Sequence, residues 1–203
     1  MSLWAIIPVK PLRRGKSRLA GVLSEEERAM LNVTLLENTL RTLKQVKEID
    51  QILVVSRDTA ALALAREFKA RTVQEGKPGL NTALKRATIV AQAYAAQDVM
   101  ILPADLPLIN VEDIRTLIGY LNKPPVVVVA PDRRNDGTNA LLVSPAGSID
   151  YMYGVGSFKK HVDQAKVKGM RVEVCNLQSF SLDLDIPEDL ELLNQIQSVK
   201  IRS

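Results

Sequence analysis

Short apolar runs alternate along the whole chain with longer segments in which apolar residues recur at helical spacing. Most of these runs are rich in β-branched residues and bounded by polar, glycine or proline residues, which is typical of buried strands. We expect strands at 3–7, 52–55, 72–73, 99–102, 126–130, 140–143 and 171–174, the first of them ended by Pro8. The alternation of strands and helices predicts a largely parallel sheet with helices on both faces.

The segments between the strands predict helices, several of them with clear start signals. Ser24 and Glu27 form a capping box, in which each side chain accepts a hydrogen bond from the other residue's backbone N–H. Thr59 is expected to cap the second helix, and Pro187 suits the first turn of the last one. We expect helices after Ser24 and at about 59–68, 81–96, 111–121, 157–168 and 187–196.

Composition predicts an ordinary globular protein. The 203 residues suffice for one well-buried α/β domain, and no linker divides them, so we expect a single domain over 1–203. Cys175 is the lone cysteine, which excludes an intrachain disulfide or a cysteine cluster and predicts a buried thiol. No segment approaches the roughly 18 apolar residues of a membrane span, and no signal-peptide core is present. We therefore expect a cytoplasmic protein without a membrane partner.

The charge pattern favours a small anionic ligand over a nucleic acid. The net charge is +4, and aromatic residues make up 4% of the chain, too few for a base-stacking surface. Lys10, Lys16 and Arg18 follow the end of the first strand, where their side chains could converge on a triphosphate. The alternative is a solvated basic loop. Gly15-Lys16-Ser17 resembles the end of a P-loop, but that motif requires a glycine at position 10.

Three aspartates follow or interrupt apolar runs. Asp105 comes directly after a predicted strand, where its carboxylate would face a ligand. Asp183 and Asp185 point to the same side if their segment is extended, with Leu182 and Leu184 facing the core. Neighbouring carboxylates repel each other unless a cation lies between them, and Mg²⁺ prefers oxygen ligands. We therefore predict a three-carboxylate magnesium site, the alternative being aspartates that only cap helices or form turns.

Two further elements suggest contacts to a small anion. Gly154 and Ser157 lead into a helix, so free amides and the serine hydroxyl would meet an anion at the positive helix end. Thr138 lies in a turn and could donate to a phosphate or carboxylate oxygen, although a simple cap and a hairpin turn are the alternatives. His161 is the only histidine and lies inside a helix, which predicts a packing role and excludes a zinc site built on histidines.

The carboxyl ends of parallel strands share one edge of an α/β sheet, and ligands bind there. Residues about 170 positions apart in sequence can therefore meet over one polyphosphate and its metal. The order of the basic turn, the glycine-containing turns and the aspartates predicts a nucleotidyltransferase.

Six motifs then carry a resemblance to one family over nearly the whole chain. They are Ile7-Pro8-Val9-Lys10-Pro11-Leu12 with Gly15-Lys16-Ser17-Arg18-Leu19-Ala20, Gly79-Leu80-Asn81-Thr82-Ala83-Leu84, Leu102-Pro103-Ala104-Asp105-Leu106-Pro107-Leu108, Pro131-Asp132-Arg133 with Gly137-Thr138-Asn139-Ala140-Leu141, Gly154-Val155-Gly156-Ser157-Phe158 with His161, and Asp183-Leu184-Asp185-Ile186-Pro187-Glu188-Asp189-Leu190. This pattern resembles the phosphoenolpyruvate and 2-phospho-L-lactate guanylyltransferases of coenzyme F-420 biosynthesis. Gly15 and Ile186 depart from it, where alanine and threonine are usual, but neither is a ligand position.

The resemblance implies a three-layer, Rossmann-like nucleotidyltransferase fold of the nucleotide-diphospho-sugar transferase type, with a mostly parallel sheet. It implies transfer of GMP from GTP to the phosphate of a three-carbon phospho-acid, with release of pyrophosphate, and a homodimer. By the same resemblance, magnesium is held by Asp105, Asp183 and Asp185, the phospho-acid is held by Thr138, Gly154 and Ser157, and the nucleotide is bordered by Glu75, Gly79 and Asn81. The catalytic assignment of Lys10, Lys16 and Arg18, beside Asp105, rests on charge and position.

Two other functions remain open at this point. A molybdenum-cofactor or sugar-phosphate nucleotidyltransferase of the same fold would show a glycine-rich turn after the first strand, whereas this chain has Val9-Lys10-Pro11-Leu12. A noncatalytic nucleotide-binding protein would have no reason to keep three aspartates of the metal-binding type, and turnover of GTP with magnesium would exclude it. The sequence leaves open whether phosphoenolpyruvate or 2-phospho-L-lactate is the acid.

Overall fold

The computed structural model describes residues 2–76 and 78–202, with side chains up to residue 198, and the predicted alternation of strands and helices is confirmed there. The strands are β1 (Leu3–Val9), β2 (Gln51–Ser56), β3 (Arg71–Gln74), β4 (Asp98–Ile101), β5 (Val126–Pro131), β6 (Thr138–Ser144) and β7 (Arg171–Val174). They form one sheet in the order β3-β2-β1-β4-β6-β5-β7. β6 runs antiparallel to both of its neighbours, and the other pairings are parallel.

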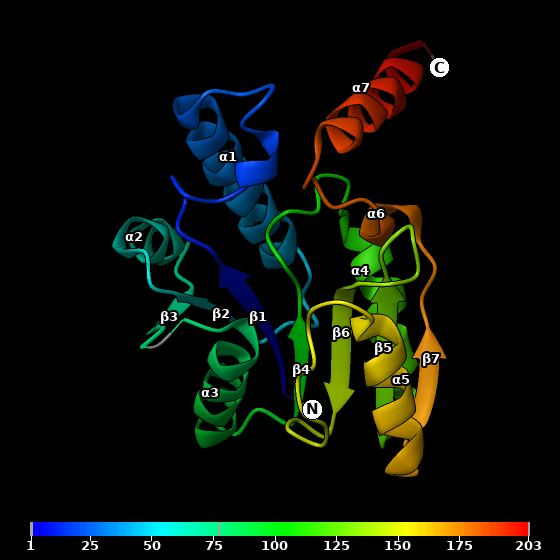
Figure 1. Cartoon of the computed structure of the whole chain (residues 1–203). Helices are drawn as coiled ribbons and strands as arrows, with labels where there is room; N and C mark the ends of the chain where they lie inside the picture. Colours follow the sequence, from blue (N-terminus) through cyan, green and yellow to red (C-terminus); the bar gives the residue numbers. More distant parts are fainter. Residues whose placement is uncertain (1, 77, 203) are drawn as a thin grey trace.

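Helices cover both faces of this sheet, which makes three layers (Figure 1). The helices are α1 (Glu25–Lys44), α2 (Thr59–Glu67), α3 (Leu80–Ala93), α4 (Val111–Gly119), α5 (Ser157–Val167), α6 (Gln178–Ser181) and α7 (Pro187–Arg202), with short 3-10 turns η1 (Ser17–Leu19) and η2 (Tyr120–Asn122). Leu3, Ala5 and Ile7 of β1 pack toward α1, α2 and α4, whereas Trp4 and Ile6 pack toward α3 and α5. Both faces of the strand are buried, and this is why its sequence is continuously apolar.

The sheet has a change of direction beside β1. The chain leaves β1 toward β2 and β3 on one side and then returns to β4 on the other side. In open α/β sheets such a switch point leaves a crevice beyond the carboxyl ends of the strands. The loops that follow β1 and β4 border this crevice, and the segment after α6 joins them, because Leu184 N–H donates to the Asp105 carbonyl at 3.1 Å.

The last segment is oriented by its leucines, as predicted. Leu182 and Leu184 are buried and pack with Leu35 of α1 and Leu193 of α7. Asp183 and Asp185 alternate with them and stay partly exposed. This small cluster connects the start of α7 to the rest of the molecule, while the helix itself extends away from the sheet (Figure 1).

One expected strand end was wrong, and one short helix was not expected. Pro8 does not end β1, since the strand runs to Val9 and Pro8 pairs in register with Val55. The Ile6 carbonyl accepts from the N–H of Leu102, just after β4. The backbone nitrogen of Pro8 faces the same side of β1, beyond the last residue that pairs with β4, so the missing N–H of proline leaves no hydrogen bond of the sheet unmade. The short helix α6 was not predicted, since four residues carry no periodic pattern.

The helix starts are partly as expected. The Ser24–Glu27 capping box is present in both directions, but Thr59 does not cap α2. Asp58 does so instead, accepting from Ala60 N–H at 2.9 Å through one carboxylate oxygen. Its other oxygen accepts from Leu12 N–H at 2.7 Å, which fastens the loop after β1 to α2. No helix in the described ranges is both long and apolar enough to cross a membrane.

We expect Asp58→Ala to lower the free energy of unfolding by about 2 kcal/mol, because the Ala60 cap and the Leu12 N–H both lose their acceptor. Thr59→Ala is the matched control and should change it by less than about 0.5 kcal/mol, since Thr59 is exposed and alanine favours a helix. Urea unfolding followed by circular dichroism measures both. A larger loss for Thr59→Ala than for Asp58→Ala would contradict the assigned cap.

Candidate active site

A cavity of about 560 Å³ lies at the carboxyl edge of the sheet, beside the switch point between β1 and β4. This volume is in the range of small-ligand sites. Segments far apart in sequence form its walls: the loop after β1, the ends of β2 and β4, the start of α3, the start of β6, the start of α5 and the segment before α7. The predicted site residues in its lining are Lys10, Lys16, Glu75, Gly79, Asp105, Thr138, Gly154, Ser157, Asp183 and Asp185.

Two predicted residues do not line this cavity. Arg18 lies in η1 and is exposed, outside the lining. Asn81, in the first turn of α3, uses its side-chain amide on the backbone of Tyr153. Its Oδ1 accepts from Tyr153 N–H at 2.8 Å, and its Nδ2 donates to the Tyr153 carbonyl at 3.2 Å. Asn81 therefore fastens α3 to the loop before α5 instead of facing the cavity.

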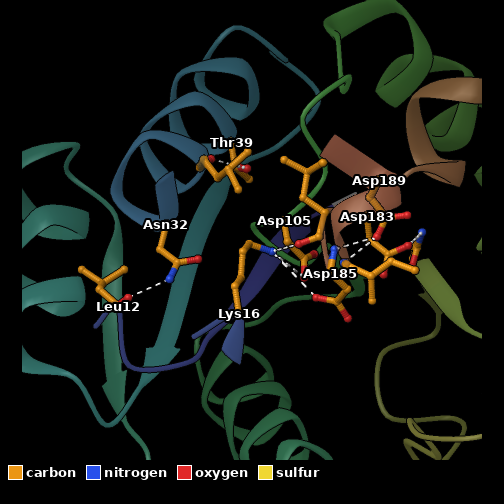
Figure 2. Close-up of polar contacts among 12 residues, drawn as sticks. Leu12, Lys16, Asn32, Thr39, Asp105, Asp183, Asp185 and Asp189 are labelled. Carbon is orange, nitrogen blue, oxygen red and sulfur yellow. Dashed lines mark hydrogen bonds and ion pairs between the residues drawn. The ribbon is translucent and has the colours of Figure 1, made fainter. Parts of the chain in front are cut away.

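Lys16 is the central cation of the cavity floor. Its side chain is only 5% exposed, and its ammonium lies 3.8 Å from a carboxylate oxygen of Asp105 and 3.8 Å from one of Asp185. The ammonium also donates to the Leu184 carbonyl. Figure 2 shows the side chain reaching from the loop after β1 into the aspartate cluster. A residue near the N-terminus thereby joins the two acidic segments that follow β4 and α6.

The backbone at Lys16 is left-handed, with φ of 55°. A residue other than glycine adopts this region at a cost of about 1–3 kcal/mol. The conformation directs the side chain inward at the start of η1, and the contacts of the ammonium offset the cost. Nearby, Asn32 of α1 donates to the Leu12 carbonyl at 2.7 Å, which holds the same loop against the helix (Figure 2).

Asp183 carries an unfavourable charge in the ligand-free protein. Burial raises the pKa of its carboxyl, and the negative charge of Asp105 raises it further. Asn139 opposes this by donating from Nδ2 to the Asp183 carboxylate at 3.3 Å, and the same Nδ2 donates to the Phe180 carbonyl at 2.8 Å. The carboxylate is held in place, and a cation that approaches it would relieve a repulsion that already exists.

Asp185 is positioned by a buried acid that the sequence analysis assigned no role. The Asp189 side chain is 7% exposed, and its Oδ2 accepts from the N–H groups of Asp185 and Ile186, both at 2.9 Å. Its Oδ1 pairs with Arg133 at 2.7 Å. Arg133 lies between β5 and β6, so the first turn of α7 is tied to the loop that precedes Thr138.

The expected cage of three carboxylates is not preformed. Within the described residues no three acidic, histidine or cysteine side chains are arranged to hold a metal ion by themselves. The physical reason is the Lys16 ammonium, which lies between Asp105 and Asp185 and neutralises part of their charge. The donor set nevertheless fits magnesium, because this ion usually takes only one or two protein carboxylates and completes its shell with phosphate oxygens and water.

The start of α5 also differs from expectation. Three amides at this helix start are already occupied: Gly156 N–H donates to the Asp136 carboxylate at 3.2 Å, and Ser157 N–H donates to the Gly154 carbonyl at 3.0 Å. Phe158 N–H donates to the Asp136 carbonyl at 3.0 Å. These three amides are therefore satisfied within the protein, and an anion at this wall would meet side-chain hydroxyls such as that of Ser157.

His161 is fully buried, as its expected packing role requires, but both of its ring nitrogens also make polar contacts. Nδ1 lies 3.0 Å from the Thr138 hydroxyl, and Nε2 accepts from Met152 N–H at 3.0 Å. Burial lowers the pKa of the imidazole to about 4, with a smaller contribution from the nearby Lys160 charge. The ring is therefore neutral near neutral pH.

Gly79 and Glu75 form the opposite wall. Gly79 precedes α3 with φ of 150°, a conformation that favours glycine, and its N–H donates to the Glu75 carboxylate at 2.9 Å. The start of α3 therefore opens onto the cavity without a bulky side chain at its cap. Leu80 and Ala83, from the first turns of this helix, add apolar lining.

Arg57 was not predicted from the sequence, and no role was expected for Asn139. Arg57 directly follows β2 and lines the cavity, so the rule that led to Lys10, a basic residue after an apolar strand, would have found it. Asn139 lies in a motif that carried the family resemblance, but its contact to Asp183 joins residues 44 positions apart and has no local signature.

Solved structures share this fold over almost the whole chain. A Desulfovibrio desulfuricans protein described as a nucleotide-diphospho-sugar transferase superposes with a TM-score of 0.78 at 16% identity, covering 95% of this chain and 87% of that protein. The 4-diphosphocytidyl-2C-methyl-D-erythritol synthase of Anaerococcus prevotii gives a TM-score of 0.62 at 15% identity, over 97% and 96% of the two chains. These likenesses confirm the predicted nucleotidyltransferase fold.

Similar sequences extend over the full chain. A phosphoenolpyruvate guanylyltransferase of Rubrobacter xylanophilus is 39% identical over 100% of this chain and 98% of the relative. A 2-phospho-L-lactate guanylyltransferase of Methanocaldococcus jannaschii is 36% identical over 91% of this chain and 79% of the relative. The model of the family "Guanylyl transferase CofC like" matches residues 3–197. The chain therefore belongs to the CofC-like guanylyl transferase family, as the resemblance predicted.

Proposed function

We propose that this protein transfers GMP from GTP to the phosphate of a three-carbon phospho-acid, phosphoenolpyruvate or 2-phospho-L-lactate, with release of pyrophosphate. The reaction would serve coenzyme F-420 biosynthesis. The observation that carries the proposal is that one cavity is lined both by the Lys16–Asp105–Asp185 cluster and by Thr138 and Ser157, which carry hydroxyls. The names of the full-length relatives supply the two candidate acids.

The cavity has two chemically different ends. On the side of β1, β2 and α3, Lys10 and Arg57 offer positive charge and the open start of α3 offers apolar lining, which suits a nucleoside triphosphate. On the side of β6 and α5, Thr138 and Ser157 offer hydroxyls, which suit the oxygens of a small acid. The aspartates and Lys16 lie in the lining between these ends, where the two phosphates would meet.

The transfer needs no general base. A phosphate monoester is already largely dianionic at neutral pH, because its second pKa is about 6. The difficulty is the approach of this anion to the anionic α-phosphate of GTP. Positioning in one cavity and offsetting positive charge are therefore the main sources of rate acceleration. Among the residues that the structure describes, Lys10, Lys16 and Arg57 are the cations in the lining.

Asp105, Asp183 and Asp185 would hold magnesium together with phosphate oxygens of GTP. The bound ion would supply positive charge against the polyphosphate. Burial and, second to it, the negative charge of Asp105 raise the pKa of Asp183, and a cation beside this carboxylate would stabilise its ionised form, which supports this assignment. The homodimer implied by the family resemblance stays a prediction, which sedimentation of the purified protein can test.

The proposal is tested by incubating the protein with GTP, Mg²⁺ and each acid separately while pyrophosphate is measured. We expect release of pyrophosphate only when phosphoenolpyruvate or 2-phospho-L-lactate is present, and a product with the combined mass of GMP and the acid. A sugar phosphate serves as the control acceptor. Turnover with the sugar phosphate alone would favour a sugar-phosphate nucleotidyltransferase, and pyrophosphate release without any acceptor would indicate simple hydrolysis.

Lys16→Ala should affect metal binding and turnover in opposite directions. Removal of the ammonium takes away a positive charge that competes for Asp105 and Asp185, so magnesium affinity without nucleotide should rise by about tenfold or more. Turnover should fall by at least about a hundredfold, because a charge that faces the phosphates is lost. Calorimetric titration of magnesium and the pyrophosphate assay measure the two effects.

Lys10→Ala is the matched control for this experiment. Lys10 lines the same cavity but is exposed and makes no ion pair within the described residues. We expect its removal to lower turnover while magnesium affinity without nucleotide stays unchanged. Equal effects of Lys10→Ala and Lys16→Ala on magnesium affinity would contradict the competition between Lys16 and the metal.

Asp183→Asn should stabilise the ligand-free protein and abolish turnover. The substitution removes a crowded negative charge and keeps an oxygen that can accept from Asn139. We expect the melting temperature without ligands to rise by about 2 °C or more. The further rise that GTP and magnesium cause in the wild type should be lost, because the metal loses a charged carboxylate ligand.

Asp150→Asn is the control for this substitution. Asp150 lies outside the cavity lining, and its side chain is 70% exposed beside Lys85. Neither its melting temperature nor its turnover should differ from the wild type. A lower melting temperature for Asp183→Asn, or full activity of that variant, would show that Asp183 is a structural acid instead of a metal ligand.

A further inference from the structure

His161 reaches the cavity only through another side chain. It is fully buried on α5 and is absent from the cavity lining, while Thr138, its neighbour at the start of β6, does line the cavity. The two side chains are connected by the 3.0 Å contact between Nδ1 and the threonine hydroxyl. A packing role alone does not require a polar group at this position.

The hydrogen bonds determine which nitrogen of His161 carries the proton. A backbone N–H can only donate, so the Nε2 atom that meets Met152 N–H at 3.0 Å must present its lone pair. A neutral imidazole then carries its one hydrogen on Nδ1. The lowered pKa of about 4, caused mainly by burial, agrees with a ring that stays neutral.

This tautomer determines the direction of the next hydrogen bond. Nδ1–H must donate, so the Thr138 hydroxyl oxygen accepts. A threonine hydroxyl has a single hydrogen, which is then left to donate elsewhere. No other hydrogen bond of this hydroxyl occurs within the described residues, and the residue borders the cavity. Thr138 is therefore prepared to donate to an acceptor atom in the cavity, and an anionic oxygen is the strongest such acceptor.

Neighbouring groups hold His161 in this state. The Tyr153 ring and the imidazole pack in a T-shaped arrangement, with 5.1 Å between ring centroids. The backbone of Tyr153 is in turn fixed by the two hydrogen bonds from Asn81. Met152, which supplies the deciding N–H, is the adjacent residue. Asn81 on α3 thus supports the loop that sets the histidine tautomer, although Asn81 does not line the cavity.

We propose that His161 is a positioning residue that makes the Thr138 hydroxyl an obligatory hydrogen-bond donor to an anionic oxygen of the phospho-acid. The inference rests on the proposed function for the identity of the ligand. The preference is for an acceptor atom on the ligand, because the one hydrogen of this hydroxyl has no other partner within the described residues. A carboxylate or phosphate oxygen satisfies it, and an amide N–H or an ammonium group does not.

Nitrogen NMR tests the tautomer without any ligand or turnover. His161 is the only histidine of the chain, so labelled histidine gives a single pair of ring-nitrogen signals. At neutral pH we expect Nδ1 to show the shift and coupling of a proton-bearing nitrogen and Nε2 those of a nitrogen with a free lone pair. A proton on Nε2, or on both nitrogens, overturns the inference.

Two substitutions of His161 separate positioning from packing. The amide nitrogen of asparagine can take the place of Nδ1, so His161→Asn should keep an N–H donor for Thr138 while Met152 N–H loses its acceptor. Glutamine reaches the place of Nε2, so His161→Gln should keep an acceptor for Met152 and lose the donor. Thr138→Val removes the hydroxyl, and Thr138→Ser retains it as the conservative variant.

We expect Thr138→Val and His161→Gln each to raise the KM for phosphoenolpyruvate or 2-phospho-L-lactate by about tenfold or more, with the KM for GTP unchanged. Their combination should be scarcely worse than either alone, because both break the same contact. His161→Asn should melt at a lower temperature than the wild type and yet keep an acid KM close to it, as should Thr138→Ser. Binding of phosphoenolpyruvate, measured by calorimetry, should follow the same order.

The outcomes distinguish this inference from the proposed function. A wild-type protein that neither binds nor turns over the acids overturns the proposed function and the ligand assignment with it. A wild-type protein active on one acid, combined with an unchanged acid KM in His161→Gln, overturns only the role of His161. Equal increases in the KM values for the acid and for GTP show general disruption of the cavity and also overturn that role.

Discussion

The ammonium of Lys16 between Asp105 and Asp185 is the interaction on which the site depends. The ammonium also donates a hydrogen bond to the Leu184 carbonyl, and these contacts hold the loop after β1 against the loops after β4 and α6. Without a cation there, Asp183 and its two acidic neighbours would repel one another across the cavity floor. The left-handed backbone at Lys16 costs conformational free energy, and the contacts of the ammonium offset this cost.

The floor of the cavity and its wall at β6 and α5 rely on different interactions. The floor relies on formal charges, which attract phosphates and a metal ion from a distance but specify little about shape. The wall at β6 and α5 relies on neutral groups, Thr138, His161 and the Met152 backbone, whose hydrogen bonds fix the direction of each donor. A charged floor with a neutral, directional wall suits two anionic substrates that must meet at one point and be told apart.

The fold could be predicted from the sequence because buried strands and amphipathic helices leave periodic patterns, and all seven strands were located. Asp105, Asp183 and Asp185 could be found because each belongs to a short motif beside an apolar run. Contacts between distant residues could not be predicted. The position of Lys16 between two carboxylates and the hydrogen bonds of Asn81 to Tyr153 depend on how separate loops meet. Arg18 belongs to the same basic segment as Lys10 and Lys16, yet it lies outside the cavity lining.

The central claim is that the phosphate of the acid attacks the α-phosphate of GTP directly, with Lys16 and the aspartates offsetting the charge. Phosphoenolpyruvate or 2-phospho-L-lactate with heavy oxygen in its phosphate group tests this by phosphorus NMR of the product. We expect the isotope shift at the guanosine α-phosphorus, because a labelled oxygen becomes the bridge between the two phosphorus atoms. A product in which this phosphorus shows no isotope shift would mean that another oxygen attacks, and would contradict the proposed transfer.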